Sequence, residues 1–234
     1  VRWYNDFIYS EGGDVDYSTK LNARLHLPFA SKRLKLIYES VSDEEFFDFF
    51  PQDSEELESA LGLRYDAYAK GYSSFNIKAT LRPRIEARYR FTYPLTTDAV
   101  FRLTQRVYQE KQETGEITDI DFDLSLSDDF LARWSNFAGY NDDLKGWEYG
   151  TGLTLYHYLS QDQALQYSAT ITATSEPYNH YEYSQMSITY RENVWKEWLF
   201  YELIPRYQWE RKPYEKHTEE ANITLRLEVL FNNI

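Results

Sequence analysis

Apolar and polar residues alternate along most of this chain. In the last stretch, Ala221 to Phe231, the odd positions are apolar and the even positions are mostly polar. The stretch Tyr17 to Leu27 alternates in the same way, with tyrosine, leucine and alanine on one side and lysine, arginine and asparagine on the other. A period of two residues places alternate side chains on opposite faces of a β-strand. Each alternating segment is therefore predicted to be a strand with one apolar and one polar face.

Turn-forming residues divide the chain into about fourteen such strands. The predicted strands are Arg2–Ser10, Tyr17–Leu27, Lys32–Val41, Leu57–Ala69, Phe75–Leu81, Ile85–Tyr93, Ala99–Tyr108, Ile117–Leu126, Phe130–Tyr140, Trp147–Tyr158, Ala164–Thr174, Tyr181–Glu192, Trp198–Trp209 and Ala221–Phe231. Pro83 cannot donate a ladder hydrogen bond, so we interpret Arg82-Pro83-Arg84 as a hairpin turn. A continuous strand there would leave about thirteen, and about twelve is the alternative for a barrel, which needs an even number.

Composition narrows the class of protein. The chain has 234 residues and shows no linker, so residues 1–234 are predicted to form a single domain. There is no cysteine, which excludes disulfides and thiolate metal sites. No apolar run approaches the roughly 20 residues of a membrane helix, and the mean hydropathy is −0.67. The net charge of −13 makes the chain a poor binder of nucleic acid.

The alternation fits either a membrane barrel or a soluble β-sandwich, and three observations favour the barrel. The predicted strands run to about 10–13 residues, which is long enough to cross a bilayer at a tilt. A soluble closed barrel of this width could not fill an apolar interior with side chains, although a sandwich could. Tyrosine and tryptophan gather at the predicted strand ends, for example Trp3, Tyr93, Tyr140, Trp147 and Trp198, as in the aromatic girdles of membrane barrels.

The final strand resembles the C-terminal strand of Gram-negative outer-membrane β-barrels, which closes on an aromatic residue. Pro83–Pro94 and Leu225–Phe231 also look like segments of uncharacterised proteobacterial barrels. The resemblance implies that Leu225, Leu227, Val229 and Phe231 form the signal read by the barrel assembly machinery. In this chain Asn232, Asn233 and Ile234 follow the aromatic residue, whereas the family usually ends on it.

This resemblance implies an all-β fold, a transmembrane antiparallel up-and-down β-barrel in the outer membrane of a Gram-negative bacterium. Both chain termini are then expected in the periplasm. Outer-membrane lipid and lipopolysaccharide are expected neighbours, and no cofactor is implied. No signal peptide is visible at Val1, as expected of the mature form of an exported chain or of a part of it.

In such a barrel the polar strand faces would line the lumen. The lumen residues would include a basic track, formed by Arg64, Lys78, Arg84, Arg88, Arg90, Arg102 and Arg106, and an acidic row, formed by Glu86, Asp119, Asp121 and Asp123. Pairing across the intervening turns predicts Arg106 opposite Asp121 and Glu86 opposite Arg106. Two interpretations stay open: a salt-bridge network that stiffens the wall, or a track that passes anions.

The segment between the third and fourth strands is strongly acidic. It contributes an outer acidic loop of Asp43, Glu44, Glu45, Asp48, Asp53, Glu55 and Glu56, with phenylalanines among them. A solvated loop is the simplest interpretation. The loop could also bridge to lipopolysaccharide phosphates through divalent cations, or contact a partner.

Three functions follow from these observations. The first is a small passive pore for small solutes, with anions as candidates. The alternative is a non-conducting barrel that anchors or threads a partner lipoprotein or surface assembly. The third, a lipid-modifying enzyme, would need histidine paired with serine or aspartate at a barrel rim. His26, His157, His180 and His217 stand in no such motif. The chain is therefore predicted not to be an enzyme, with no catalytic residue and no metal site.

Overall fold

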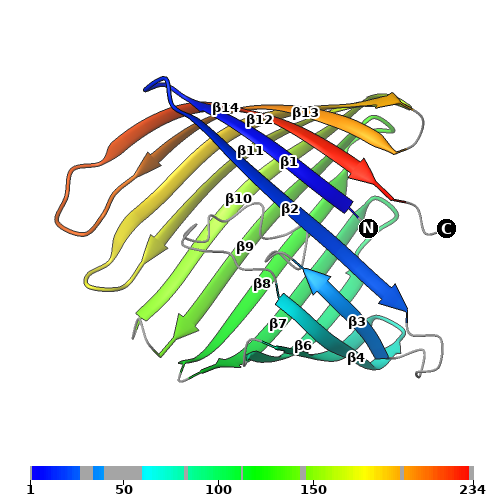
Figure 1. Cartoon of the computed structure of the whole chain (residues 1–234). Coiled ribbons are helices and arrows are strands. Elements are labelled where there is room, and N and C mark those ends of the chain that lie inside the picture. The colour runs from blue at the N-terminus through cyan, green and yellow to red at the C-terminus, as the bar shows by residue number, and fades with distance from the viewer. Residues whose placement is uncertain are drawn as a thin grey trace.

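A single antiparallel sheet closes on itself in the computed structural model, which describes residues 2–26, 34–39, 60–81, 84–111, 113–142, 146–195 and 198–231. Each strand pairs with its neighbours in sequence, and β1 pairs with β14 to close the barrel (Figure 1). The strands are β1 Arg2–Ser10, β2 Val15–His26, β3 Leu34–Glu39, β4 Ala60–Lys70, β5 Ser73–Thr80, β6 Arg84–Pro94, β7 Ala99–Glu110, β8 Glu113–Ser125, β9 Phe130–Asn141, β10 Gly146–Ser160, β11 Gln163–Thr174, β12 His180–Trp195, β13 Leu199–Glu210 and β14 Thr218–Leu230. The all-β, antiparallel, up-and-down prediction is confirmed.

The connections are short wherever the structure describes them. Gly71 lies at a φ of 61° in the two-residue turn between β4 and β5, a backbone conformation that glycine adopts without strain. Thr80 pairs with Arg84, so the chain reverses between these two residues and the predicted hairpin is confirmed. In the described residues no helix is long and apolar enough to cross a membrane.

The closing seam joins the two ends of the chain. Arg2 pairs with Leu230, and Ser10 pairs with Asn222, so β1 and β14 run side by side along the whole of β1. The start of β1 and the end of β14 therefore lie at the same end of the barrel.

Pro205 lies inside β13 and interrupts one ladder. Between β12 and β13 the paired residues go from Ser187–Arg206 directly to Tyr190–Leu203, without a change of register. The gap is expected because proline has no N–H to donate. The other ladder of β13 continues through this point, where Pro205 pairs with Ile223.

Candidate functional site: the lumen wall

Polar side chains are inside this barrel and apolar side chains are outside. Among the described residues, sixteen polar or charged side chains are buried, whereas only Ala173 and Ile204 are buried hydrophobic ones. On β14, Asn222, Thr224 and Glu228 are buried while the alternate residues Ile223 and Leu225 are exposed. A soluble sandwich or barrel would show the reverse distribution, because water would meet the polar face. The apolar outer surface must instead face lipid.

The acidic row of β8 is held by arginines on both neighbouring strands. Arg106 Nη2 on β7 donates to Asp119 Oδ2 at 2.7 Å, with both side chains almost fully buried. Arg102 approaches Asp121 at 3.7 Å and Asp123 at 3.6 Å. From β9, Arg133 donates twice to Asp123, at 2.5 and 3.0 Å. Three aspartates and three arginines thus form one balanced ladder across β7, β8 and β9.

The β6 part of the basic track lies beside this ladder. Arg84 contacts Glu86 at 3.0 Å and Glu110 at 3.2 Å. Arg90 Nε donates to Thr104 Oγ1 at 3.2 Å. Arg88 is buried and lies directly opposite Arg106 in the β6–β7 register. The basic track and the acidic row therefore belong to one continuous area of the lumen wall.

The predicted cross-strand partners were wrong, although the predicted faces were right. Arg106 lies opposite Ile117, not Asp121, and Asp121 lies opposite Arg102. Glu86 lies opposite Tyr108, not Arg106. The β7–β8 turn is tighter than the sequence suggested, because Lys111 takes a left-handed φ of 49° and the strands extend to Glu110 and Glu113. The β7–β8 pairs are shifted by four residues along one strand and the β6–β7 pairs by two, and both even shifts leave each side chain on its predicted face.

The remaining predicted site residues have these positions. Lys78 lies on β5 opposite Glu86. Arg64 lies on β4 opposite Lys78 in register, and its side chain is outside the described part of the structure. The outer acidic loop, Asp43 to Glu56, lies outside the described residues. Leu225, Leu227 and Val229 take alternate positions on β14, and Phe231, which follows that strand, is half exposed.

A second ionic cluster lies at the closing seam, and sequence reasoning missed it. Arg226 on β14 donates to both carboxylate oxygens of Asp6 on β1, at 2.7 and 3.1 Å, and approaches Glu202 on β13 at 3.5 Å. Arg191 on β12 contacts Glu202, and it also contacts Glu228 at 2.5 Å. The polar positions of the last strand were visible in the sequence, but their partners become neighbours only when the barrel closes.

The histidines make ordinary contacts. His180 Nδ1 lies 2.7 Å from the carbonyl oxygen of Tyr178, and His217 Nε2 lies 3.4 Å from Glu219. His157 stacks on Phe130. The side chain of His26 is outside the described part. Within the residues that the structure describes, no group of three or more histidine, aspartate or glutamate side chains could hold a metal ion.

Comparisons with known proteins identify the fold. No family model and no curated protein matches the sequence. Among solved structures, the outer-membrane channel DcaP of Acinetobacter baumannii matches with a TM-score of 0.61 and 9% identity, over 99% of this chain and 95% of that one. OmpT of Vibrio cholerae matches with a TM-score of 0.60 and 7% identity, over 98% and 96%. The KdgM porin, solved in complex with disordered oligogalacturonate, matches with a TM-score of 0.51 and 8% identity, over 99% and 100%.

This is the fold of Gram-negative outer-membrane β-barrels. The same conclusion follows from the inverted distribution of polarity, since an apolar band around a polar interior is the arrangement that lipid requires. The predicted class and the predicted outer-membrane location are confirmed.

Proposed function

We propose that the barrel is a passive channel for small polar solutes across the outer membrane, with a modest preference for anions. The observation that carries this proposal is the lumen wall, where charged side chains of β6 to β9 lie in a continuous polar area. The similar structures include the KdgM porin, the DcaP channel and a channel named for monoaromatic hydrocarbons, CymD. These relatives support a channel, and the preference for anions rests on this chain's own charges.

The balance of charges decides how strong the preference should be. The lumen faces of β6 and β7 carry five arginines, Arg84, Arg88, Arg90, Arg102 and Arg106, against two acids, Glu86 and Glu110. Glu113 and the three aspartates of β8 raise the acidic total to six, and Arg133 of β9 raises the number of arginines to six, so the charges balance. Rings of one sign set steep selectivity, whereas a balanced wall does not. We therefore propose weak anion selectivity that depends on the β6–β7 arginines.

We also propose that the chain ends face the periplasm. The long connection of residues 40–59, between β3 and β4, leaves the opposite end of the barrel. The turns at the terminal end include two of only two residues, Gly71–Tyr72 and Gln161–Asp162. Short periplasmic turns and longer outer loops are the general pattern of these barrels.

Conductance of the refolded barrel in a planar bilayer tests the channel. We expect stable steps, with a reversal potential under a salt gradient that indicates weak anion preference. Arg88→Ala and Arg102→Ala should each move the reversal potential toward cation preference, because each removes a positive charge from the lumen wall. Arg211→Ala is the matched control, since Arg211 is exposed in a connection between strands. A folded barrel that does not conduct would overturn the proposal that it is a channel.

A non-conducting barrel that holds a partner is the second candidate. In that case the folded barrel would not conduct in the bilayer, and a lipoprotein or surface protein would copurify with it from the native membrane.

A further inference from the structure

Four polar side chains lie together on the outer wall of the barrel, near the middle of β7 to β10. They form two cross-strand pairs: Gln105 lies opposite Thr118, and Asn136 lies opposite Thr151. Gln105 and Asn136 are each the seventh residue of a twelve-residue strand. The middle of a spanning strand lies near the middle of the hydrocarbon core, which is about 30 Å thick. We call these four residues the midplane polar patch.

The alternation of buried and exposed residues shows that the patch faces outward. Arg106 follows Gln105 in β7 and is buried in the lumen wall. Ser135 precedes Asn136 in β9 and is also buried, whereas Trp134 is 48% exposed on the outside. Successive side chains of a strand point to opposite faces, so Gln105 and Asn136 point toward lipid.

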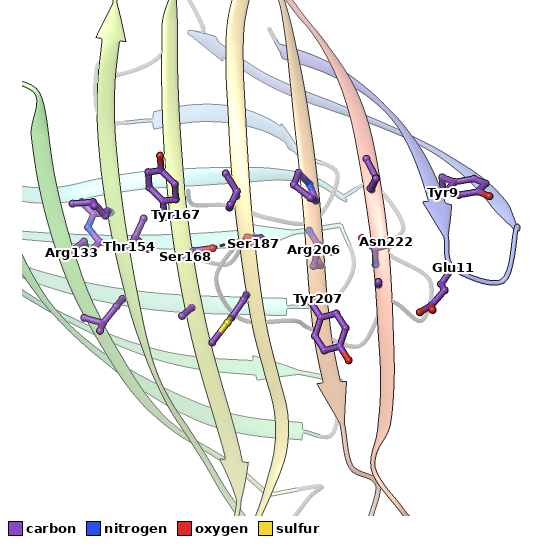
Figure 2. A pocket seen from close by; sticks show the side chains of 18 of the residues that line it. Tyr9, Glu11, Arg133, Thr154, Tyr167, Ser168, Ser187, Arg206, Tyr207 and Asn222 are labelled. Carbon is purple, nitrogen blue, oxygen red and sulfur yellow. Dashed lines mark hydrogen bonds between the residues drawn. The ribbon is translucent and has the colours of Figure 1, made fainter.

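The neighbouring part of the outer wall is apolar. An outward-facing groove crosses β9 to β14 and β1, and its exposed lining includes Leu153, Met186 and Ile223. Figure 2 shows this part of the wall from close by. Polar residues labelled there, such as Ser168 and Asn222, occupy the alternate strand positions that face the lumen. The midplane polar patch therefore differs from the wall beside it.

The amide of Asn136 lacks a hydrogen bond in a place where lipid offers none. Within the residues that the structure describes, neither the side-chain oxygen nor the side-chain nitrogen of Asn136 is hydrogen-bonded. Its neighbours in the patch are paired: Thr118 donates to Gln105 Oε1, and Thr151 Oγ1 accepts from Trp134 Nε1 at 2.9 Å. An unpaired amide in hydrocarbon is costly, because lipid tails have no hydrogen-bonding group. Asn136 is partly exposed, so a partner can reach it.

We propose that the midplane polar patch is the interface of a dimer of this chain, in which the two Asn136 side chains bond to each other. A carboxamide both donates and accepts, so two of them related by a two-fold axis can form two hydrogen bonds. An axis along the membrane normal keeps both copies in the same orientation and brings residues of equal depth together. Ala138, the next outward residue of β9, is small and allows a close approach.

A second copy fits the patch better than a lipid does. Lipid headgroups lie at the edges of the hydrocarbon core, about 15 Å from its middle, so they do not reach Asn136. The commonest protein dimers bring the same surface of both subunits together, and such a surface must complement itself. The amide of Asn136 meets that requirement. Polar and small side chains are also typical of contacts between proteins inside membranes.

Asn5 provides a matched control on the far side of the barrel. It is an outward-facing asparagine near the middle of β1, next to the buried Asp6. Its oxygen already accepts a hydrogen bond from the Tyr17 hydroxyl at 2.8 Å and lies 3.3 Å from Thr19 Oγ1. Asn5 therefore has no free acceptor for a reciprocal pair.

Sedimentation equilibrium of the whole refolded barrel in density-matched detergent micelles tests the proposal. We expect wild type to form dimers of twice its 28.0 kDa mass when detergent is scarce. Asn136→Leu should weaken the association about tenfold, because two hydrogen bonds are lost. Asn136→Gln keeps the amide and should associate more tightly than Asn136→Leu, and Asn5→Leu should associate like wild type. Leucine suits a lipid-facing position, so both leucine variants should fold, and gel mobility with and without heating checks this.

Energy transfer in lipid vesicles keeps the test decisive if micelles dissociate the dimer. The chain has no cysteine, so Asp129→Cys, in the exposed turn between β8 and β9, accepts a single dye. Copies with donor and acceptor dyes should show transfer that persists on dilution with lipid and falls in Asn136→Leu. A monomer in both micelles and vesicles would overturn the proposal. So would equal association of wild type and Asn136→Leu, because the copies would then meet through another face.

Discussion

At the scale of single residues, the lumen wall is held by arginines that share aspartates. Asp123 on β8 accepts a hydrogen bond from Arg133 on β9 and lies 3.6 Å from Arg102 on β7, so one carboxylate links three strands. Buried charges of this kind persist only when they are paired. The pairing explains how so many charges are accommodated in one area, and it also limits how far any one of them can act on a passing ion.

Asp121→Asn tests this balance. The side chain of Asp121 is almost fully buried and lies 3.7 Å from Arg102. Removing its negative charge without changing its shape leaves the β6–β9 wall with an excess of positive charge. We expect the ratio of anion to cation permeability to rise about twofold, as measured by the reversal potential under a salt gradient. Asp129→Asn, in an exposed turn, is the control. An unchanged reversal potential would show that Asp121 does not act on the permeating ion.

At the scale of the elements, the β7–β8 hairpin depends on a glycine covered by an aromatic ring. Gly115 lies directly opposite Tyr108, and a Cβ at Gly115 would collide with the Tyr108 ring. The ring lies beneath the guanidinium of Arg84, whose carbon is 4.4 Å from the ring centre. The Tyr108 hydroxyl donates to Glu113. A larger residue at Gly115 must therefore disturb several contacts at once.

Gly115→Ala should destabilise the barrel by about 1–3 kcal/mol, the usual range for overpacking. Gly139→Ala is the matched control, because its Cβ would meet its nearest neighbour, Ile117, at an ordinary 3.5 Å. Urea unfolding of both variants in lipid vesicles, followed by tryptophan fluorescence, measures the difference. Equal stabilities would mean that the Tyr108 ring moves aside at little cost.

At this scale the sequence correctly predicted the strand face on which each side chain lies, but not its cross-strand partner. Alternation correctly assigned Arg102, Arg106, Asp119 and Asp121 to the polar face, because the side-chain period of a strand is fixed by backbone geometry. Partners depend on the turn, and the turn here is tightened by the left-handed Lys111. A non-glycine residue in that conformation is uncommon, so the sequence favoured a longer loop.

At the scale of the whole molecule, closure brings together groups more than two hundred residues apart. Arg226 binds both oxygens of Asp6 and thereby ties the last strand to the first. Asp6 is buried, and Arg226 is only about one-fifth exposed. Glu202 and Arg191 extend the cluster to β13 and β12. This ionic cluster therefore links β1, β12, β13 and β14 across the seam.

Arg226→Ala should loosen that seam. Breaking a buried pair leaves Asp6 uncompensated, and we expect a loss of about 2–3 kcal/mol because Arg226 is partly exposed. The temperature at which the compact gel form of the barrel disappears should fall by about 4–12 °C. Lys212→Ala is the control, since its ion pair with Glu210 is long and exposed, at 4.0 Å. Identical melting of Arg226→Ala and wild type would mean that the backbone ladder alone holds the seam.

The sequence by itself determined which residues form strands and which face of each strand is apolar. These are local properties: a strand alternates its side chains, and proline, glycine and the short polar residues end it. The alternation of Ile223, Leu225 and Leu227 with Thr224 and Arg226 could be seen in the sequence and is present in β14. Strand length and the aromatic strand ends were enough to favour a bilayer over water.

Only the tertiary structure decided which polar groups meet and where the outer surface is hollow. The pairing of Asp6 with Arg226 exists because the barrel closes, and Arg102 meets Asp121 because of the tight turn at Lys111. An outward-facing groove that includes Ala169 and Ala221 crosses β9 to β14 and β1, so its shape depends on the register of seven strands at once. These are relations between distant segments, and alternation within one strand carries no information about them.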